Sequence, residues 1–163
     1  MDRNIRFIPK MIDKKNFKKA IAQPLEKAGF KKKGQSGYLI GPDTIVSLSL
    51  QKSDWWELYF IELDIQLAST KDDKLPPKGD FLFSHRLGEI FQDKQEMIHK
   101  GSSLDTGDLE SLVRLSYFIE SDVVPFLKEC TSFEKLREKL NAGIFRKGLI
   151  TAKAKELLGE NSS

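Results

Sequence analysis

The sequence predicts an α+β fold: an N-terminal helix, an antiparallel β-meander of three to five strands, and two or three C-terminal helices packed on one face of the sheet. Apolar residues recur at helical spacing near the N-terminus, alternate with polar residues in the middle of the chain, and return to helical spacing towards the C-terminus. The length of 163 residues is that of one ordinary domain. We therefore expect a single domain over residues 1–163, with its core at about 14–158 and flexible loops at about 70–80 and 101–107.

The first predicted helix runs from about Lys14 to Ala28. Its apolar positions recur every three or four residues: Phe17, Ala20, Ile21, Leu25 and Ala28. Pro24 lies inside this pattern and lacks the amide that would bond to the carbonyl of Ala20, so we expect a kink or a break near Gln23. Gly29 favours the end of the helix.

Short strands are predicted after this helix. Tyr38–Ile40 leads into a Gly-Pro-Asp turn, and the strand Thr44–Lys52 follows it. A longer strand is expected from Glu57 to Leu67, because its odd-numbered residues from 59 onward are all apolar. Phe81–Phe91 and Lys94–Lys100 are assigned as a fourth and a fifth strand, although the apolar residues of the first segment fit a helical turn equally well.

Helical spacing dominates the last third of the chain. It extends from Leu109 to Lys128, with Pro125 as a kink point. Thr131 and Glu134 have the spacing of a capping box and predict the start of a second helix. A last helix is expected from about Lys147 to Leu158.

Composition excludes several classes of protein. A charged fraction of 31% and a mean hydropathy of −0.40 leave no apolar run that could span a bilayer, so we expect no membrane association. The N-terminus lacks the apolar segment of a secretory signal. Cys130 has no second cysteine for a disulfide, and with only His85 and His99 it cannot build a zinc cage. We expect a cytoplasmic protein with no metal and no cofactor.

The net charge of +3 conceals an uneven distribution. Residues 1–33 contain eleven Lys or Arg and three Asp or Glu, a balance of +8, and the rest of the chain therefore carries −5. Lys31, Lys32 and Lys33 stand between two glycines and form the densest basic cluster. Lysines can attract a phosphate, but a solvated turn after a helix explains the cluster more simply, and the spacing is not that of a phosphate-binding loop.

Two further groups of residues are candidate binding sites. Trp55 and Trp56 follow each other near a strand end, where one ring can be buried while the other is exposed. The polar residues of the two long strands share one face if the strands pair, and they would then form a polar platform: Ser47, Ser49, Gln51, Glu62 and Asp64.

The leading hypothesis is a non-catalytic domain that recognises a protein partner through the polar platform and the Trp55–Trp56 edge. Nucleic-acid binding by the basic N-terminal segment is the alternative, and it lacks interleaved aromatic residues that would stack on bases. A hydrolase or metal-dependent enzyme that uses Glu62, Asp64 and one histidine is the third hypothesis. Cys130 has no base nearby in sequence and is interpreted as a packing residue, so no catalytic residue is predicted.

Several short motifs carry a family resemblance over roughly residues 14–140. They are the segment GFKKKG at Gly29–Gly34, Gln-Lys-Ser at Gln51–Ser53 and Arg-Leu-Gly at Arg86–Gly88, together with the helix Ser121–Leu127. In these features the chain resembles an uncharacterised bacterial family with a domain of unknown function. The resemblance implies a small cytoplasmic α+β domain without established catalytic residues, and relatives thought to neutralise toxins or bind partners.

Overall fold

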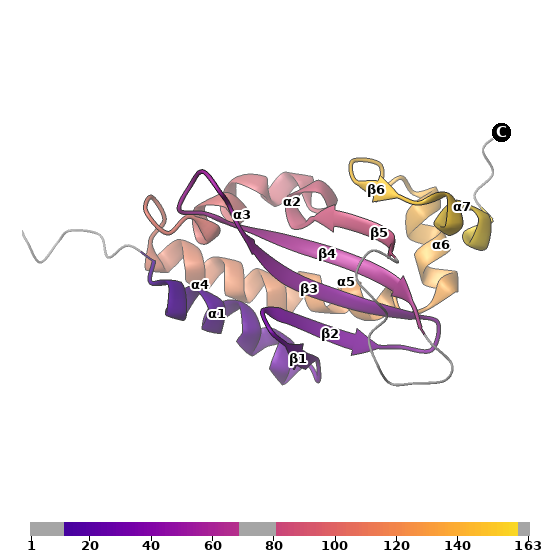
Figure 1. Cartoon of the computed structure of the whole chain (residues 1–163), viewed down its shortest axis with the longest axis horizontal. Coiled ribbons are helices and arrows are strands. Elements are labelled where there is room, and N and C mark those ends of the chain that lie inside the picture. Colours follow the sequence, from indigo (N-terminus) through magenta and orange to yellow (C-terminus); the bar gives the residue numbers. More distant parts are fainter. Residues whose placement is uncertain (1–11, 69–80, 160–163) are drawn as a thin grey trace, which may run out of the picture.

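A six-stranded antiparallel sheet and a layer of helices make up the computed structural model, which describes residues 12–68 and 81–159 (Figure 1). The first five strands are neighbours in space in the order of the sequence, and the sixth pairs with the fifth. Their bounds are β1 (Lys31–Lys33), β2 (Ser36–Ile40), β3 (Thr44–Lys52), β4 (Tyr59–Leu67), β5 (Phe81–Arg86) and β6 (Leu149–Ile150). The α+β class is confirmed, with one strand more than the three to five expected.

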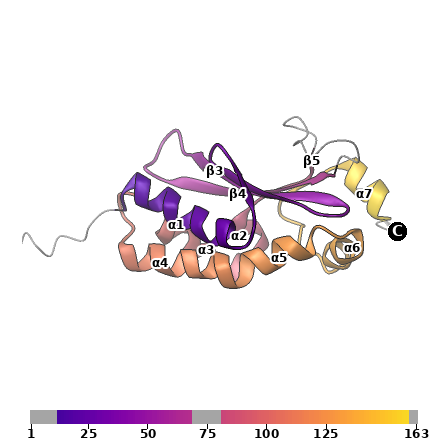
Figure 2. The same cartoon turned by 90° about the horizontal axis from the view of Figure 1, so that it is seen from below.

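Most helices lie against one face of this sheet, and the last one stands at its end, as the side view shows (Figure 2). Their bounds are α1 (Lys14–Lys27), α2 (Leu87–Ile90), α3 (Gln95–Ser102), α4 (Leu109–Phe118), α5 (Val124–Glu129), α6 (Phe133–Asn141) and α7 (Ala152–Leu158). A 3-10 turn at Gln92–Lys94 precedes α3. No helix in residues 12–68 or 81–159 is long and apolar enough to cross a membrane.

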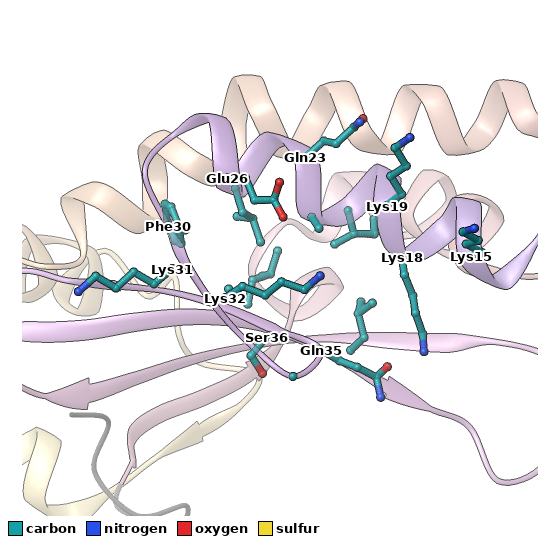
Figure 3. Close-up of a pocket in the computed structure, with 17 residues that line it drawn as sticks. Lys15, Lys18, Lys19, Gln23, Glu26, Phe30, Lys31, Lys32, Gln35 and Ser36 are labelled. Carbon is teal, nitrogen blue, oxygen red and sulfur yellow. The ribbon is translucent and has the colours of Figure 1, made fainter. Parts of the chain in front are cut away.

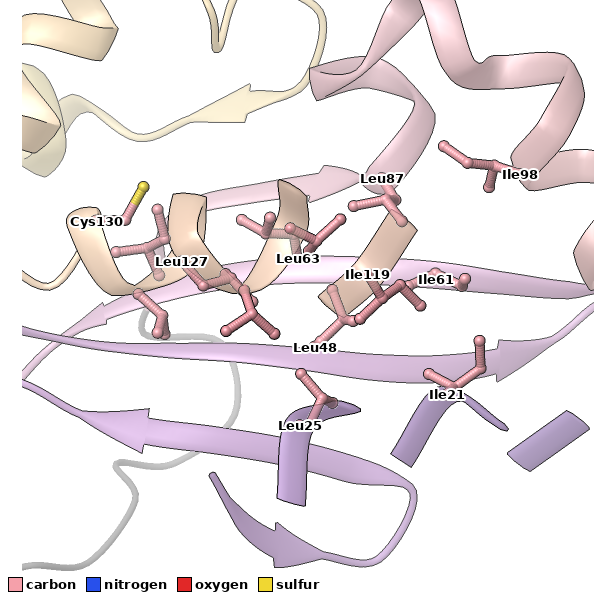
Figure 4. Close-up of a cluster of buried hydrophobic side chains, with 14 of the residues drawn as sticks. Ile21, Leu25, Leu48, Ile61, Leu63, Leu87, Ile98, Ile119, Leu127 and Cys130 are labelled. Atoms are coloured by element: carbon pink, nitrogen blue, oxygen red, sulfur yellow. The ribbon is translucent and has the colours of Figure 1, made fainter. Parts of the chain in front are cut away.

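The register of β3 against β4 decides which side chains face the helices. Leu48 lies opposite Leu63, and Val46 lies opposite Ile65. All four are buried, and they form the sheet side of the core. Figure 4 shows Leu48 and Leu63 facing Ile119 and Leu127 of the helical layer. The alternation predicted for both strands is therefore confirmed.

Pro24 lies within α1, yet the helix continues through it to Lys27. Proline cannot donate to the carbonyl four residues earlier, which belongs to Ala20. The hydroxyl of Ser116 in α4 donates to that carbonyl at 2.7 Å. Ser116 thereby replaces the missing helical hydrogen bond and joins α1 to α4, so the expected break at Gln23 is absent.

The interruption predicted at Pro125 takes the form of a π-helical turn at Ile119–Val123. The amide of Val124 donates to the carbonyl of Ile119, five residues back rather than four. Pro125 then stands in the first turn of α5, where its missing amide costs little. The wider turn lets α4 and α5 run almost end to end along the sheet (Figure 2).

Several expected elements are corrected by the structure. Lys94–Lys100, expected as a strand, lies mostly in α3, and Gly101 and Ser102 extend this helix into the expected loop. A Cβ at Gly101 would lie 2.7 Å from the Cβ of Leu115, so this glycine permits close contact between α3 and α4. Phe81–Phe91 is a strand only as far as Arg86. The expected loop at 70–80 lies outside the described residues.

Three other helix or strand boundaries differ from the prediction, because the backbone there forms hydrogen bonds that the sequence pattern did not indicate. Lys31–Lys33 is a strand rather than a turn, since Gly34, with φ +59°, reverses the chain and pairs it with β2. Ser132 rather than Thr131 caps α6 and accepts from the amide of Lys135. The last helix begins at Ala152, because residues 149–150 pair with β5.

The bond from Ser116 to Ala20 predicts a specific stability defect. We expect Ser116→Ala to lower the free energy of unfolding by about 1–2 kcal/mol, because the Ala20 carbonyl loses its donor. In the Pro24→Ala background residue 24 supplies its own amide to that carbonyl, so the same substitution should cost clearly less. Urea denaturation of the four proteins of this double-mutant cycle measures the coupling. An equal cost in both backgrounds would contradict this assignment.

Candidate functional site

The connection between β3 and β4 presents the two tryptophans to solvent. Trp55 is 87% exposed and Trp56 is 69% exposed. The buried Ser53 hydroxyl accepts from the amides of both residues at 3.2 Å. The Lys52 ammonium donates to the carbonyl of Trp56 at 2.9 Å. We call residues 53–58 the tryptophan turn: its backbone is held by hydrogen bonds while its rings are free.

The tryptophan turn also rests on the connection between α3 and α4. The amide of Leu104 donates to the carbonyl of Glu57 at 2.7 Å, and Leu58 forms an antiparallel bridge with Ser103. Leu104 and Leu58 are both buried. The turn is therefore anchored at its base on the helical layer, which fixes where the two indole rings stand. Both rings are exposed, whereas the sequence allowed one of them to be buried.

The polar platform expected from the sequence is present as the second face of the sheet. Ser47 lies opposite Asp64, Ser49 opposite Glu62, and Gln51 opposite Phe60. None of the described helices covers this face in the side view (Figure 2). Near Thr44, at the start of β3, this face is not exposed to solvent, because Ile45 and Gln66 are buried. We call this surface the polar face.

Strand β5 adds residues to the polar face that the sequence did not identify. Ser84 lies opposite Asp64 and donates its hydroxyl to that carboxylate at 2.6 Å. Arg86 lies opposite Glu62, with 3.9 Å between its Nε and the carboxylate. The guanidinium also stacks on Phe60, 3.8 Å from the ring centroid. The alternation of residues within Phe81–Arg86 indicates a strand, but nothing in the sequence determines how that strand pairs with β4.

The two carboxylates at the centre of the polar face bind protons more tightly than isolated side chains do. Partial burial raises the pKa of Glu62, and the neighbouring charge of Asp64 raises it further, while Arg86 opposes the shift. Partial burial likewise raises the pKa of Asp64, against the hydrogen bond from Ser84. Ionisation of both groups at neutral pH therefore disfavours the folded state.

The hypothesised catalytic group of Glu62, Asp64 and a histidine is not assembled with His85. His85 pairs with Leu63 on the helix-facing side of β5, and its Nε2 lies 2.7 Å from the carbonyl oxygen of Phe145. Within the described residues, no group of three or more His, Cys, Asp or Glu side chains could hold a metal ion.

The cysteine has the role expected of a packing residue. Cys130 is fully buried, and burial raises the pKa of its thiol to about 12. A thiol with that pKa is not a thiolate at neutral pH and is a poor nucleophile. Its carbonyl accepts the Thr44 hydroxyl at 2.6 Å, which joins β3 to the end of α5.

Strand alternation separates the three lysines of the basic cluster. Lys31 and Lys33 pair with Tyr38 and Ser36 in the rows of the polar face. Lys32 pairs with Gly37 and belongs to the helix-facing rows, so the three ammonium groups do not form one surface. Nucleic-acid binding through residues 1–33 stays a prediction, because residues 1–11 lie outside the described part of the chain.

The fold and the candidate site define a class: a two-layer α+β domain with an antiparallel meander, a polar sheet face that is partly exposed among the described residues, and an exposed aromatic turn at its edge. The chain belongs to the family of the domain of unknown function DUF4304, whose model matches residues 21–129. This confirms the family resemblance of the sequence at the level of an uncharacterised domain. Neither the curated proteins nor the solved structures contain a significant match.

The raised pKa of Asp64 predicts an unusual pH dependence. Asp64→Asn keeps an oxygen that accepts from Ser84 but removes the charge, so we expect the variant to be more stable than the wild type at pH 7.5. As the pH falls through the raised pKa towards the unfolded value of about 3.9, the wild-type carboxyl becomes neutral and the advantage disappears. Urea midpoints at pH 7.5 and pH 4 measure this difference.

Asp105→Asn is the matched control, because Asp105 is an exposed carboxylate outside the polar face. It should give no advantage that changes with pH. A stability difference for Asp64→Asn that is the same at both pH values would show that burial of the charge is not the cause.

Proposed function

We propose that this domain is a non-catalytic, cytoplasmic module that recognises a protein partner through the tryptophan turn and the adjoining polar face. A toxin-neutralising or accessory role is the sharpest form of this proposal. The observation that carries it is the exposure of Trp55 and Trp56, at 87% and 69%, on a turn whose backbone is hydrogen bonded.

Exposed tryptophans on an anchored turn suit recognition for two physical reasons. An indole ring buries a large apolar area on association and is enriched among the residues that dominate binding energy. The backbone is already fixed, because the Ser53 hydroxyl accepts from its amides and the Lys52 ammonium donates to a carbonyl, so little conformational entropy is lost when a partner binds. Both rings are mostly exposed, so packing of the core does not explain why tryptophans occupy these two positions.

The polar face continues the candidate interface along the strands. Gln51 and Phe60, next to the tryptophan turn, lead to the Arg86 guanidinium that stacks on Phe60. Arginine is, like tryptophan, enriched at the centres of interfaces. The carboxylates beyond it add charges that select a partner by complementarity. Aromatic anchors beside a polar surface are typical of a protein–protein interface.

A binding experiment tests the proposal. The tagged full chain is used to capture partners from the native host, and the affinity of a captured and then purified protein is measured by calorimetry. We expect Trp55→Ala and Trp56→Ala each to weaken binding by about thirtyfold, the effect of losing a dominant interface residue.

Tyr117→Ala is the matched control. Tyr117 is 69% exposed, like Trp56, but it lies on α4 and outside the proposed interface. Its loss should leave the affinity unchanged. The proposal fails if no protein is captured, or if the tryptophan variants bind as tightly as the wild type.

A further inference from the structure

A cavity of about 370 Å³ lies between α1 and the β1–β2 hairpin, on the helix-facing side of the sheet (Figure 3). Its floor is aliphatic, with Ile21 and Leu25 from α1 and Leu48 and Leu50 from β3. This volume lies within the range of roughly 300–1,000 Å³ that is typical of small-molecule sites. The cavity is distinct from the tryptophan turn, none of whose residues lines it, and it shares only Lys31 and Ser36 with the rows of the polar face.

Two glycines shape the hairpin side of this cavity. A Cβ at Gly37 would come within 2.8 Å of Leu25 Cδ1, so the absence of a side chain lets β2 approach α1 closely. Gly34, with φ +59°, makes the tight turn that carries Gln35 at the rim. The two glycines thus let the hairpin stand close to α1 and shape one wall of the cavity.

The rim of the cavity is strongly basic. Its charged residues are the lysines Lys15, Lys18, Lys19, Lys31 and Lys32 and the single acid Glu26. Within residues 12–68 and 81–159, none of these lysines forms an ion pair with a carboxylate. Figure 3 shows Lys18 and Lys32 pointing into the space between the helix and the hairpin, whereas Lys31 points away from it.

The direction of Lys32 follows from the strand register. Its neighbours across the sheet are Gly37 and then Leu48, which lies on the cavity floor. Lys18 approaches from the opposite wall, with its Nζ 5.9 Å from the centroid of the buried Tyr59 ring. The two ammonium groups therefore project from facing elements above an aliphatic floor.

We propose that this cavity binds a small aliphatic carboxylate, with its head between Lys18 and Lys32 and its chain on Ile21, Leu25 and Leu50. Unpaired ammonium groups on facing walls repel each other, and a bound anion removes that repulsion. An aliphatic chain gains free energy by burying its apolar surface on that floor. A polyanion such as a nucleic acid uses neither the aliphatic floor nor the concave shape.

Binding is tested with octanoate and two probes that each lack one half of its chemistry. Inorganic phosphate carries charge without a chain, and octan-1-ol carries the chain without charge. We expect octanoate to shift the amide resonances of Ile21, Leu25 and Gly37 in ¹H–¹⁵N spectra, with at least tenfold tighter binding than either probe. If phosphate binds as tightly as octanoate, the aliphatic floor has no role in binding. If octan-1-ol binds as tightly as octanoate, the lysines have no role.

Two double variants with the same change of net charge locate the head group. Lys18→Gln with Lys32→Gln should weaken octanoate binding about tenfold, whereas Lys33→Gln with Lys128→Gln should leave it unchanged. Neither Lys33 nor Lys128 lines the cavity, because Lys33 lies in a row of the polar face and Lys128 is an exposed residue of α5. Equal weakening by both doubles would indicate general charge attraction and overturn the site.

A third variant tests the cavity itself. Ala22 lines it from α1, and Ala22→Phe fills part of its volume while keeping every lysine. We expect this variant to stay folded, as judged by its amide spectrum, and to lose octanoate binding. Unchanged binding by the folded variant would place the ligand elsewhere and contradict the proposal.

Discussion

The pairing of β3 with β4 is the constraint on which the rest of the structure depends. Leu48 opposite Leu63 places one row of apolar side chains towards the helices, and Ser47 opposite Asp64 places a polar row on the other side. A slip of one residue would exchange the two faces, because side chains alternate along a strand. The loss of apolar burial would be large, so the core fixes the register, and the register in turn fixes every surface described above.

The same pairing separates three surfaces with different chemistry. The tryptophan turn closes the β3–β4 hairpin, the polar face extends from it along the strands, and the lysine-rimmed cavity lies on the opposite side of the sheet. The helical layer supports two of them: the α3–α4 connection anchors the turn through Leu104, and α1 forms one wall of the cavity. The two ligands proposed above, a protein and a small carboxylate, are therefore assigned to different surfaces of the domain.

The sequence predicts those parts of the fold where a periodic pattern is long. The helical spacing predicts the bounds of α1 to within one residue. The two faces of β3 and β4 are also predicted, because the alternation of apolar and polar residues continues over nine residues in each strand. Prediction from the sequence fails where a glycine has a tertiary role: Gly101 resembles a loop residue but permits close contact between α3 and α4. It also misses Arg86 and Ser84, since their positions beside the carboxylates depend on a register that only packing determines. The lysine-rimmed cavity brings together α1, β1 and β3, which no local pattern relates.

We propose that the helix-facing rows stabilise the fold and that the tryptophan turn serves recognition instead. The free energy of unfolding of the Trp55→Ala/Trp56→Ala double variant tests this most directly. Because both rings are mostly exposed, we expect a loss of at most about 1 kcal/mol by urea denaturation. A loss of more than about 3 kcal/mol, the usual cost of deleting a buried tryptophan, would show that the rings support the fold and would contradict the account.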